Sequence, residues 1–90
     1  MLSAILTLIE RAILEIVNAY APEEVSAQDL RRLLRSCGFR RTAPALVFTM
    51  MSLEDKGLVT CREDVQVIEG IEVRHRSYRA RKGVEWRDAQ

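Results

Sequence analysis

The stretch SLEDKGLVT, residues 52–60, contains the end of one element and the start of another. Gly57 is typical of the residue that ends an α-helix, since glycine adopts the left-handed backbone conformation without steric cost. Leu58, Val59 and the β-branched Thr60 that follow favour a strand. We therefore expect a helix that ends at Gly57 and a strand that begins directly after it.

Two further helices are expected upstream. Residues 2–20 carry apolar side chains three and four positions apart, which is the pattern of one face of a helix. Pro22 ends this segment, because proline lacks the amide hydrogen that a helix interior needs. A second helix should run from Ala27 to about Cys37, with Ser26 as its N-cap and Gly38 as the residue that ends it.

The third helix is predicted to follow Thr42, which is a good N-cap, and to accept Pro44 in its first turn. Its buried stripe is expected to consist of Leu46, Val47, Met50 and Leu53. At 100° per residue, the opposite and exposed face would carry Arg41, Ala45, Phe48, Thr49 and Ser52.

The segment from residue 58 to residue 82 predicts a β-hairpin, because valine and isoleucine alternate with polar residues on both sides of a turn. A three-residue loop at 68–70 would set apolar side chains opposite each other, in the pairs Val67–Ile71 and Val65–Val73. A short extra strand is expected near Val25.

Ninety residues suffice for one domain with a single core. The expected class is α+β: a helix at about 2–20, two helices in a helix-turn-helix at about 26–57, and a hairpin at about 58–82. Three helices followed by a two-stranded ribbon is the element order of a winged helix-turn-helix domain.

Residues 26–83 resemble winged-helix transcriptional regulators of the PadR-like and MarR-like kinds. The matching features are the capped second helix, Thr42 at the start of the third, the segment 53–59 at its end, and the Tyr78-Arg79-Ala80 strand before Gly83. The resemblance implies a cytoplasmic protein that binds double-stranded DNA and regulates transcription. The helix at 42–56 would enter the major groove, and the wing at 58–82 would contact the backbone.

PadR-like proteins usually continue into a long C-terminal dimerisation helix, which this sequence does not show. If the protein forms a homodimer, helix one is therefore the expected surface, and its apolar excess supports that expectation. Burial of the same residues within their own chain is the alternative. The length also fits small regulators of phages and mobile elements that consist of a bare winged-helix domain.

The charge distribution says more about partners than the formal net charge of +1. Residues 31–41 and residues 74–82 each contain several basic side chains and no acidic one, although they lie far apart in the sequence. The predicted DNA contacts are Arg31, Arg35, Arg40, Arg41, Thr42, Ala45, Thr49, Arg74, Arg76 and Arg79. Two other interpretations stay open: a solvated helix face around Arg31, and cross-strand ion pairs of Arg74 and Arg76 with Glu63 and Asp64.

The predicted recognition face also carries an argument against DNA. An exposed Phe48 with Met51 beside it is more typical of a contact with protein. The second hypothesis is therefore a winged-helix interaction module or adaptor without DNA binding, with a protein partner held by Phe48, Met51, Leu2 and Leu6.

Several function classes are not expected. Cys37 and Cys61 stand alone with one histidine in the chain, so neither a metal site nor a disulfide framework is predicted, and both should be reduced thiols. No nucleophile set or phosphate-binding glycine loop indicates an enzyme or a cofactor. The apolar start is interrupted by Glu10, Arg11 and Glu15, so no membrane span is expected.

Overall fold

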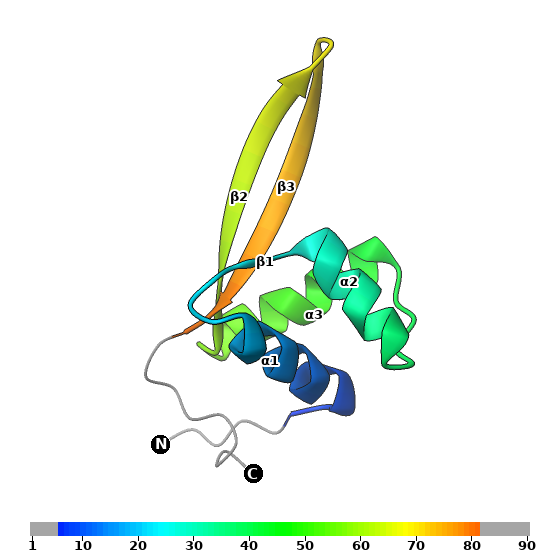
Figure 1. The fold of residues 1–90 in the computed structure, drawn as a ribbon, viewed down its shortest axis with the longest axis vertical. Helices are drawn as coiled ribbons and strands as arrows, with labels where there is room; N and C mark the ends of the chain where they lie inside the picture. The colour runs from blue at the N-terminus through cyan, green and yellow to red at the C-terminus, as the bar shows by residue number, and fades with distance from the viewer. Residues whose placement is uncertain (1–5, 82–90) are drawn as a thin grey trace.

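The computed structural model describes residues 6–81, which form an α+β fold of three helices and a three-stranded antiparallel sheet (Figure 1). The elements are α1 (Leu8–Tyr20), β1 (Val25–Ser26), α2 (Ala27–Ser36), α3 (Ala43–Asp55), β2 (Val59–Ile68) and β3 (Ile71–Ala80). The strand order is β1-β3-β2. The helices gather at one end of the molecule, and β2 and β3 extend away from them as a long hairpin. The expected class, the order of the elements and the short strand at Val25 are confirmed.

The ends of α2 and α3 follow the predicted capping chemistry. The side-chain oxygen of Ser26 accepts from the amide of Asp29 at 3.1 Å, and that of Thr42 accepts from the amide of Ala45 at 3.3 Å. Each bond satisfies an amide that has no partner within the helix. Both helices end where the sequence predicts, at Gly38 with φ 91° and at Gly57 with φ 75°.

Replacing Gly57 by alanine is expected to lower the free energy of unfolding by about 1–2 kcal/mol, because a side chain at positive φ is strained. The added Cβ would also lie 3.3 Å from Nη1 of Arg81, which can move aside. Gly38→Ala is the matched control, since its φ is also positive but nothing lies within 4 Å of its Cβ. Urea denaturation should give similar losses for both variants, and an unchanged midpoint for Gly57→Ala would contradict the requirement for glycine.

The start of the first helix differs from the prediction. α1 begins at Leu8 rather than near residue 2, and residues 1–5 lie outside the described part. Thr7 is the N-cap: its Oγ1 accepts from the amide of Glu10 at 3.2 Å, and Oε1 of Glu10 accepts from the amide of Thr7 at 2.9 Å. This reciprocal capping box satisfies two amides at once and begins the helix there.

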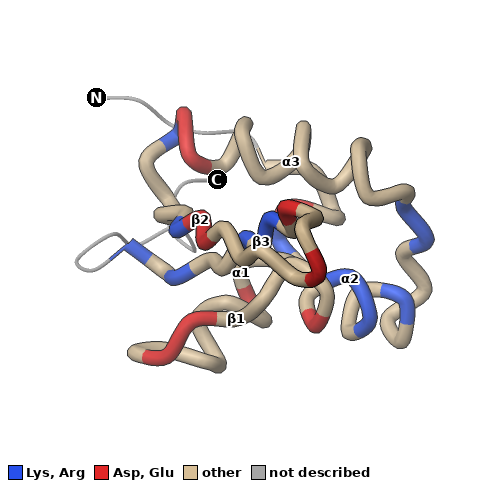
Figure 2. The backbone as a smooth tube through the Cα atoms, turned by 90° about the horizontal axis from the view of Figure 1, so that it is seen from above, with Lys and Arg blue, Asp and Glu red and all other residues tan. Residues whose placement is uncertain are grey.

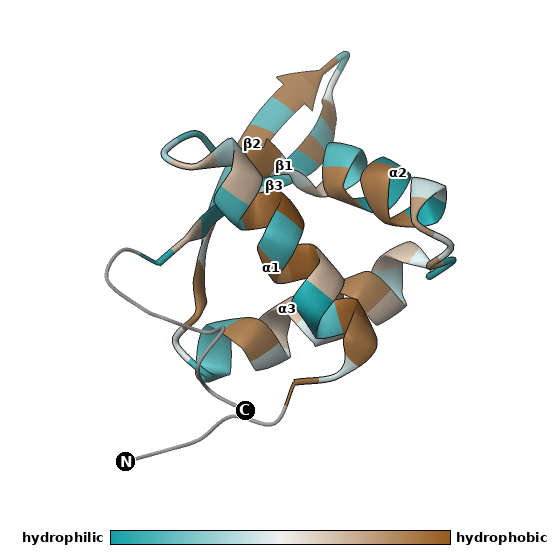
Figure 3. Cartoon of the chain, turned by 60° about the horizontal axis from the view of Figure 1, so that its bottom comes forward, coloured by the Kyte–Doolittle hydropathy of each residue, from teal (hydrophilic) through white to brown (hydrophobic). Residues whose placement is uncertain are grey.

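The core lies between the three helices and the base of the hairpin. Its fully buried side chains are Ile13, Leu14, Val17, Val25, Leu30, Leu34, Met50, Leu53 and Tyr78. Leu33 and Val47, which were expected in the buried stripes, are only partly buried. Most of the apolar stripe of α1 is therefore buried within its own chain. This burial was the alternative to a dimer interface on the first helix. Figure 3 shows apolar bands on α1 and also along the hairpin to its far end.

The predicted hairpin register is wrong. The loop has two residues, Glu69 and Gly70, with φ 51° and 79°, so Ile68 lies opposite Ile71 and Val67 opposite Glu72. Two residues at positive φ form a turn whose twist matches that of the strands. The far part of the hairpin is exposed on both faces, so no buried face selects a pairing of apolar with apolar side chains.

Candidate nucleic-acid interface

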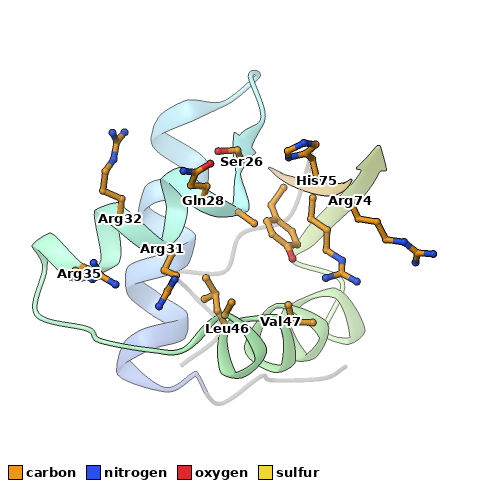
Figure 4. Close-up of a pocket in the computed structure, with 13 residues that line it drawn as sticks. Ser26, Gln28, Arg31, Arg32, Arg35, Leu46, Val47, Arg74 and His75 are labelled. Atoms are coloured by element: carbon orange, nitrogen blue, oxygen red, sulfur yellow. The ribbon is translucent and has the colours of Figure 1, made fainter. Parts of the chain in front are cut away.

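A groove lies between α2, the N-terminal part of α3 and β3, with a volume of about 640 Å³. Leu46 and Val47 of α3 contribute apolar lining, and the basic side chains come from the other two elements (Figure 4). The basic residues that line it are Arg31, Arg32, Arg35, Arg74, His75 and Arg76. The structure thus places the two basic segments of the sequence at one groove.

α2 presents Arg31 and Arg35 on one face because they are four residues apart. Nε of Arg31 donates to the carbonyl oxygen of Arg41 at 3.0 Å, which ties α2 to the turn before α3. Arg32 points away from α3 in Figure 4 and pairs with Asp29 at 3.1 Å. Its exposed position agrees with the solvated-face interpretation for that residue.

A second hollow of about 430 Å³ extends the basic surface to the start of α3. It is lined by Arg31, Arg35, Arg40, Arg41 and Thr42. Figure 2 shows the basic residues of α2 and of the turn into α3 close to one another. Arg31 and Arg35 line both hollows, so the arginines form one continuous cationic surface, and the free amides of the α3 N-terminus add a partial positive charge.

Strand β3 divides its arginines between two faces. Arg74 and Arg76 alternate in step with Tyr78, whose ring is buried in the core, so they lie on the face toward the helices. Burial raises the pKa of Tyr78 to about 12, so its hydroxyl stays neutral at physiological pH. Arg79 lies on the opposite face by the same alternation. The three wing arginines predicted to contact DNA therefore do not share one face of the hairpin.

The opposite face of the hairpin holds an ion-pair cluster of its own. Arg62 contacts Glu24 at 2.8 Å and Asp64 at 2.6 Å. The hydrogen bonds from Arg62, together with its charge and that of Arg79, hold the pKa of Glu24 below its ordinary value. This face is therefore close to neutral, in contrast to the groove.

Cross-strand ion pairing also occurs on the groove side, as the alternative interpretation predicted. Glu63 lies 3.2 Å from Nε of Arg76 and 3.9 Å from Nη1 of Arg74. Exposed ion pairs of this kind stabilise a fold by about 0.2–1 kcal/mol. A charge-assisted hydrogen bond from an arginine to a phosphate is stronger where water is excluded from the contact. Glu63 would thus compete only weakly with a phosphate for the guanidinium groups of Arg74 and Arg76.

The exposed face of α3 is less polar than predicted. The hydroxyl of Thr49 donates to the carbonyl oxygen of Ala45 at 3.1 Å, and both residues are partly buried. Ser52 was expected on this face, but its hydroxyl donates to Oε2 of Glu10 at 3.2 Å, because that buried carboxylate needs donors. Phe48 and Met51 are exposed as predicted, at 72% and 51%.

Of the two leucines assigned to a protein partner, Leu6 does not contribute surface. Leu6 is 7% exposed and belongs to the core, so its assignment is wrong. Leu2 lies outside the described residues.

An ion pair that the sequence patterns do not predict joins the buried Glu10 of α1 to Lys56, a partly exposed residue at the end of α3. Glu10 is 3% exposed, and Nζ of Lys56 lies 2.8 Å and 3.0 Å from its carboxylate oxygens. Burial raises the pKa of Glu10, but the bonds from Lys56 and Thr7 outweigh it and hold the pKa below its ordinary value of 4.5. The spacing of Thr7 and Glu10 indicates the capping box. No nearby residue indicates that Lys56 is the ion-pair partner of Glu10.

Within residues 6–81, no cluster of three or more histidine, cysteine or acidic side chains could hold a metal ion, and Cys37 and Cys61 are free thiols. No helix in the same range is long and apolar enough to cross a membrane. No protein-family model matches the chain, and no curated protein matches its sequence.

Proposed function

We propose that this protein binds double-stranded DNA through a winged helix-turn-helix, in which α2 and α3 form the helix-turn-helix and β2 and β3 form the wing. The observation that supports the proposal is the groove, where arginines from α2 and from β3 line one surface beside the start of α3. Clustered arginines without an equal number of carboxylates attract a phosphate backbone.

In the proposed complex, the N-terminal part of α3 enters the major groove, so Arg41 and Thr42 come closest to the bases. Arg31, Arg35 and Arg40 contact phosphates on one side of the helix, and the arginines of the wing contact phosphates on the other. Such a domain fits a small cytoplasmic transcriptional regulator. Dimerisation through helix one stays a prediction, and the large apolar side chains that α1 exposes for it are Leu8 and Tyr20.

The proposal is tested by fluorescence anisotropy of a labelled random-sequence duplex, titrated with the protein at several salt concentrations. Binding at micromolar concentration is expected, with a log affinity that falls by about 0.9 per phosphate contact for each tenfold rise in salt. Absence of binding at about 50 mM salt would overturn the proposal, since non-specific binding is strongest there.

The two faces of the wing are expected to differ in these titrations. Arg74→Ala combined with Arg76→Ala should reduce the salt slope by about 2, because two phosphate contacts are lost. Arg79→Ala changes the same residue type on the same strand but on the other face, and should leave the slope unchanged. Equal effects of the pair and of the control would show that the wing does not approach DNA by its groove side.

A second candidate function is a protein-interaction module, favoured by the exposure of Phe48 and Met51. Phe48→Ser is expected to abolish a complex with a protein partner and to leave the fold intact, because the ring lies outside the core. Loss of duplex binding in the same variant, with circular dichroism unchanged, would instead place Phe48 at the DNA surface.

A further inference from the structure

The far end of the hairpin exposes an unusual amount of apolar surface. Val65, Val67, Ile68 and Ile71 are 49%, 68%, 53% and 66% exposed, and Ile68 lies directly opposite Ile71 in the register. No helix covers this end in Figure 1. A two-stranded hairpin alone is marginally stable in water, and clustered exposed apolar side chains mark an interaction surface.

The same end, which we term the tip (residues 65–72), is acidic. Glu69 in the turn and Glu72 beside it are exposed, and neither forms an ion pair with any residue between 6 and 81. The carboxylates nearer the base differ, because Glu63 and Asp64 are paired with arginines. The tip therefore combines apolar side chains with unneutralised negative charge, a chemistry that repels a phosphate backbone and suits a cationic protein surface.

The exposed face of α3 has the complementary chemistry. Arg40 and Arg41, in the turn directly before α3, are exposed and form no ion pair within the described residues, and Phe48 and Met51 lie exposed three residues apart on one side of the helix. A cationic end thus joins an apolar stripe. The tip cannot reach this face in its own chain, because the hairpin holds it at the opposite end of the molecule (Figure 1).

We propose that the tip of one copy docks on the exposed face of α3 in a second copy. Val65 and Val67, which share a face of the hairpin with Glu72, would pack on Phe48 and Met51, while Glu72 and the turn residue Glu69 would face Arg40 and Arg41. Each copy offers one tip and one α3 face, and in the proposed two-fold dimer these meet in two identical contacts. If the proposed function holds, DNA and the second copy compete for α3, and the dimer is the form that does not bind DNA.

The test is sedimentation velocity of the full chain without DNA, from about 1 to 300 µM, a range that spans weak interfaces. The wild-type protein is expected to dimerise at low salt and to dissociate at high salt. Glu69→Lys with Glu72→Lys should raise the dissociation constant more than about 100-fold, and so should Arg40→Glu with Arg41→Glu, because like charges would then meet. An equimolar mixture of the two double variants should form a dimer again, since each contact pairs opposite charges.

Glu23→Lys, an exposed carboxylate in the loop between α1 and β1, is the control for altered net charge and should dimerise like the wild type. Circular dichroism checks that each variant is folded. A wild-type monomer at every concentration, a dimer that survives both reversals, or a mixture that stays monomeric would each overturn the proposal. The result is separate from the test of DNA binding, because no duplex is present; adding duplex afterwards should dissociate the dimer.

Discussion

Exchanging Arg31 and Arg35 together for glutamate is expected to reduce affinity for a random duplex by about 100-fold or more at low salt. These two side chains line both basic hollows. They would therefore contact phosphates whichever hollow the DNA backbone follows. The substitution removes two contacts and adds two repelling charges. The salt slope should fall by about 2 for the lost contacts alone. Fluorescence anisotropy measures both quantities in one series of titrations.

Arg32→Glu is the matched control on the same helix. Arg32 lines only the first hollow, its side chain points away from α3 and it already pairs with Asp29, so the change should reduce affinity less than the double exchange. Arg31→Glu also removes the bond to the carbonyl oxygen of Arg41, and thermal denaturation must show that the double variant remains folded. A folded double variant with wild-type affinity would contradict a DNA site in this groove.

The parts of the fold that the sequence predicts best are those set by neighbouring residues. Ser26 and Thr42 cap helices because each oxygen reaches an amide three positions ahead, and Gly57 ends α3 because it adopts a positive φ. These interactions require no knowledge of the rest of the chain. The same kind of signal was present at Thr7 and Glu10, and it places the start of α1 correctly when it is used.

The strand alternation held more information than the sequence analysis used. Tyr78 was expected to pack on the helices, and side chains two apart share a face of a strand. Arg74 and Arg76 therefore belong with Tyr78, and Arg79 with the other face. The register of the hairpin could not be predicted in this way, because it depends on whether one face of the hairpin is buried. Burial depends in turn on how far the tip lies from the helices, which the residues of the tip do not indicate.

The second large effect is expected from Glu10, whose partner Lys56, at the C-cap of α3, is 46 positions away in the chain. Glu10→Ala should lower the free energy of unfolding by about 3 kcal/mol, near the lower end for breaking a buried pair because Lys56 can still reach water. The change also removes the carboxylate of the capping box and a bond from Ser52. Glu23→Ala, at an exposed position, should change stability by less than about 0.5 kcal/mol.

Lys56→Ala allows the pair to be separated from the other contacts of Glu10. If the carboxylate and the ammonium stabilise the fold together, the double variant should lose less than the sum of the two single variants. Urea denaturation of the wild type and the three variants provides this comparison. Strict additivity would mean that the capping box and Ser52, rather than Lys56, account for the effect of Glu10.

The contribution of Glu10 should also depend on pH in a definite direction. Because its pKa in the folded protein lies below the ordinary 4.5, the unfolded chain binds more protons between the two values, so stability rises with pH in that window. The contribution is complete above about pH 5 and is lost as pH falls through the lowered pKa. Glu24 titrates in the same direction, so the informative quantity is the difference between the wild type and Glu10→Gln, in which Glu24 is unchanged. That difference should be constant from about pH 5 to 7 and shrink below pH 4.5, whereas a difference that grows in acid would show that burial, and not Lys56, dominates the pKa of this carboxyl.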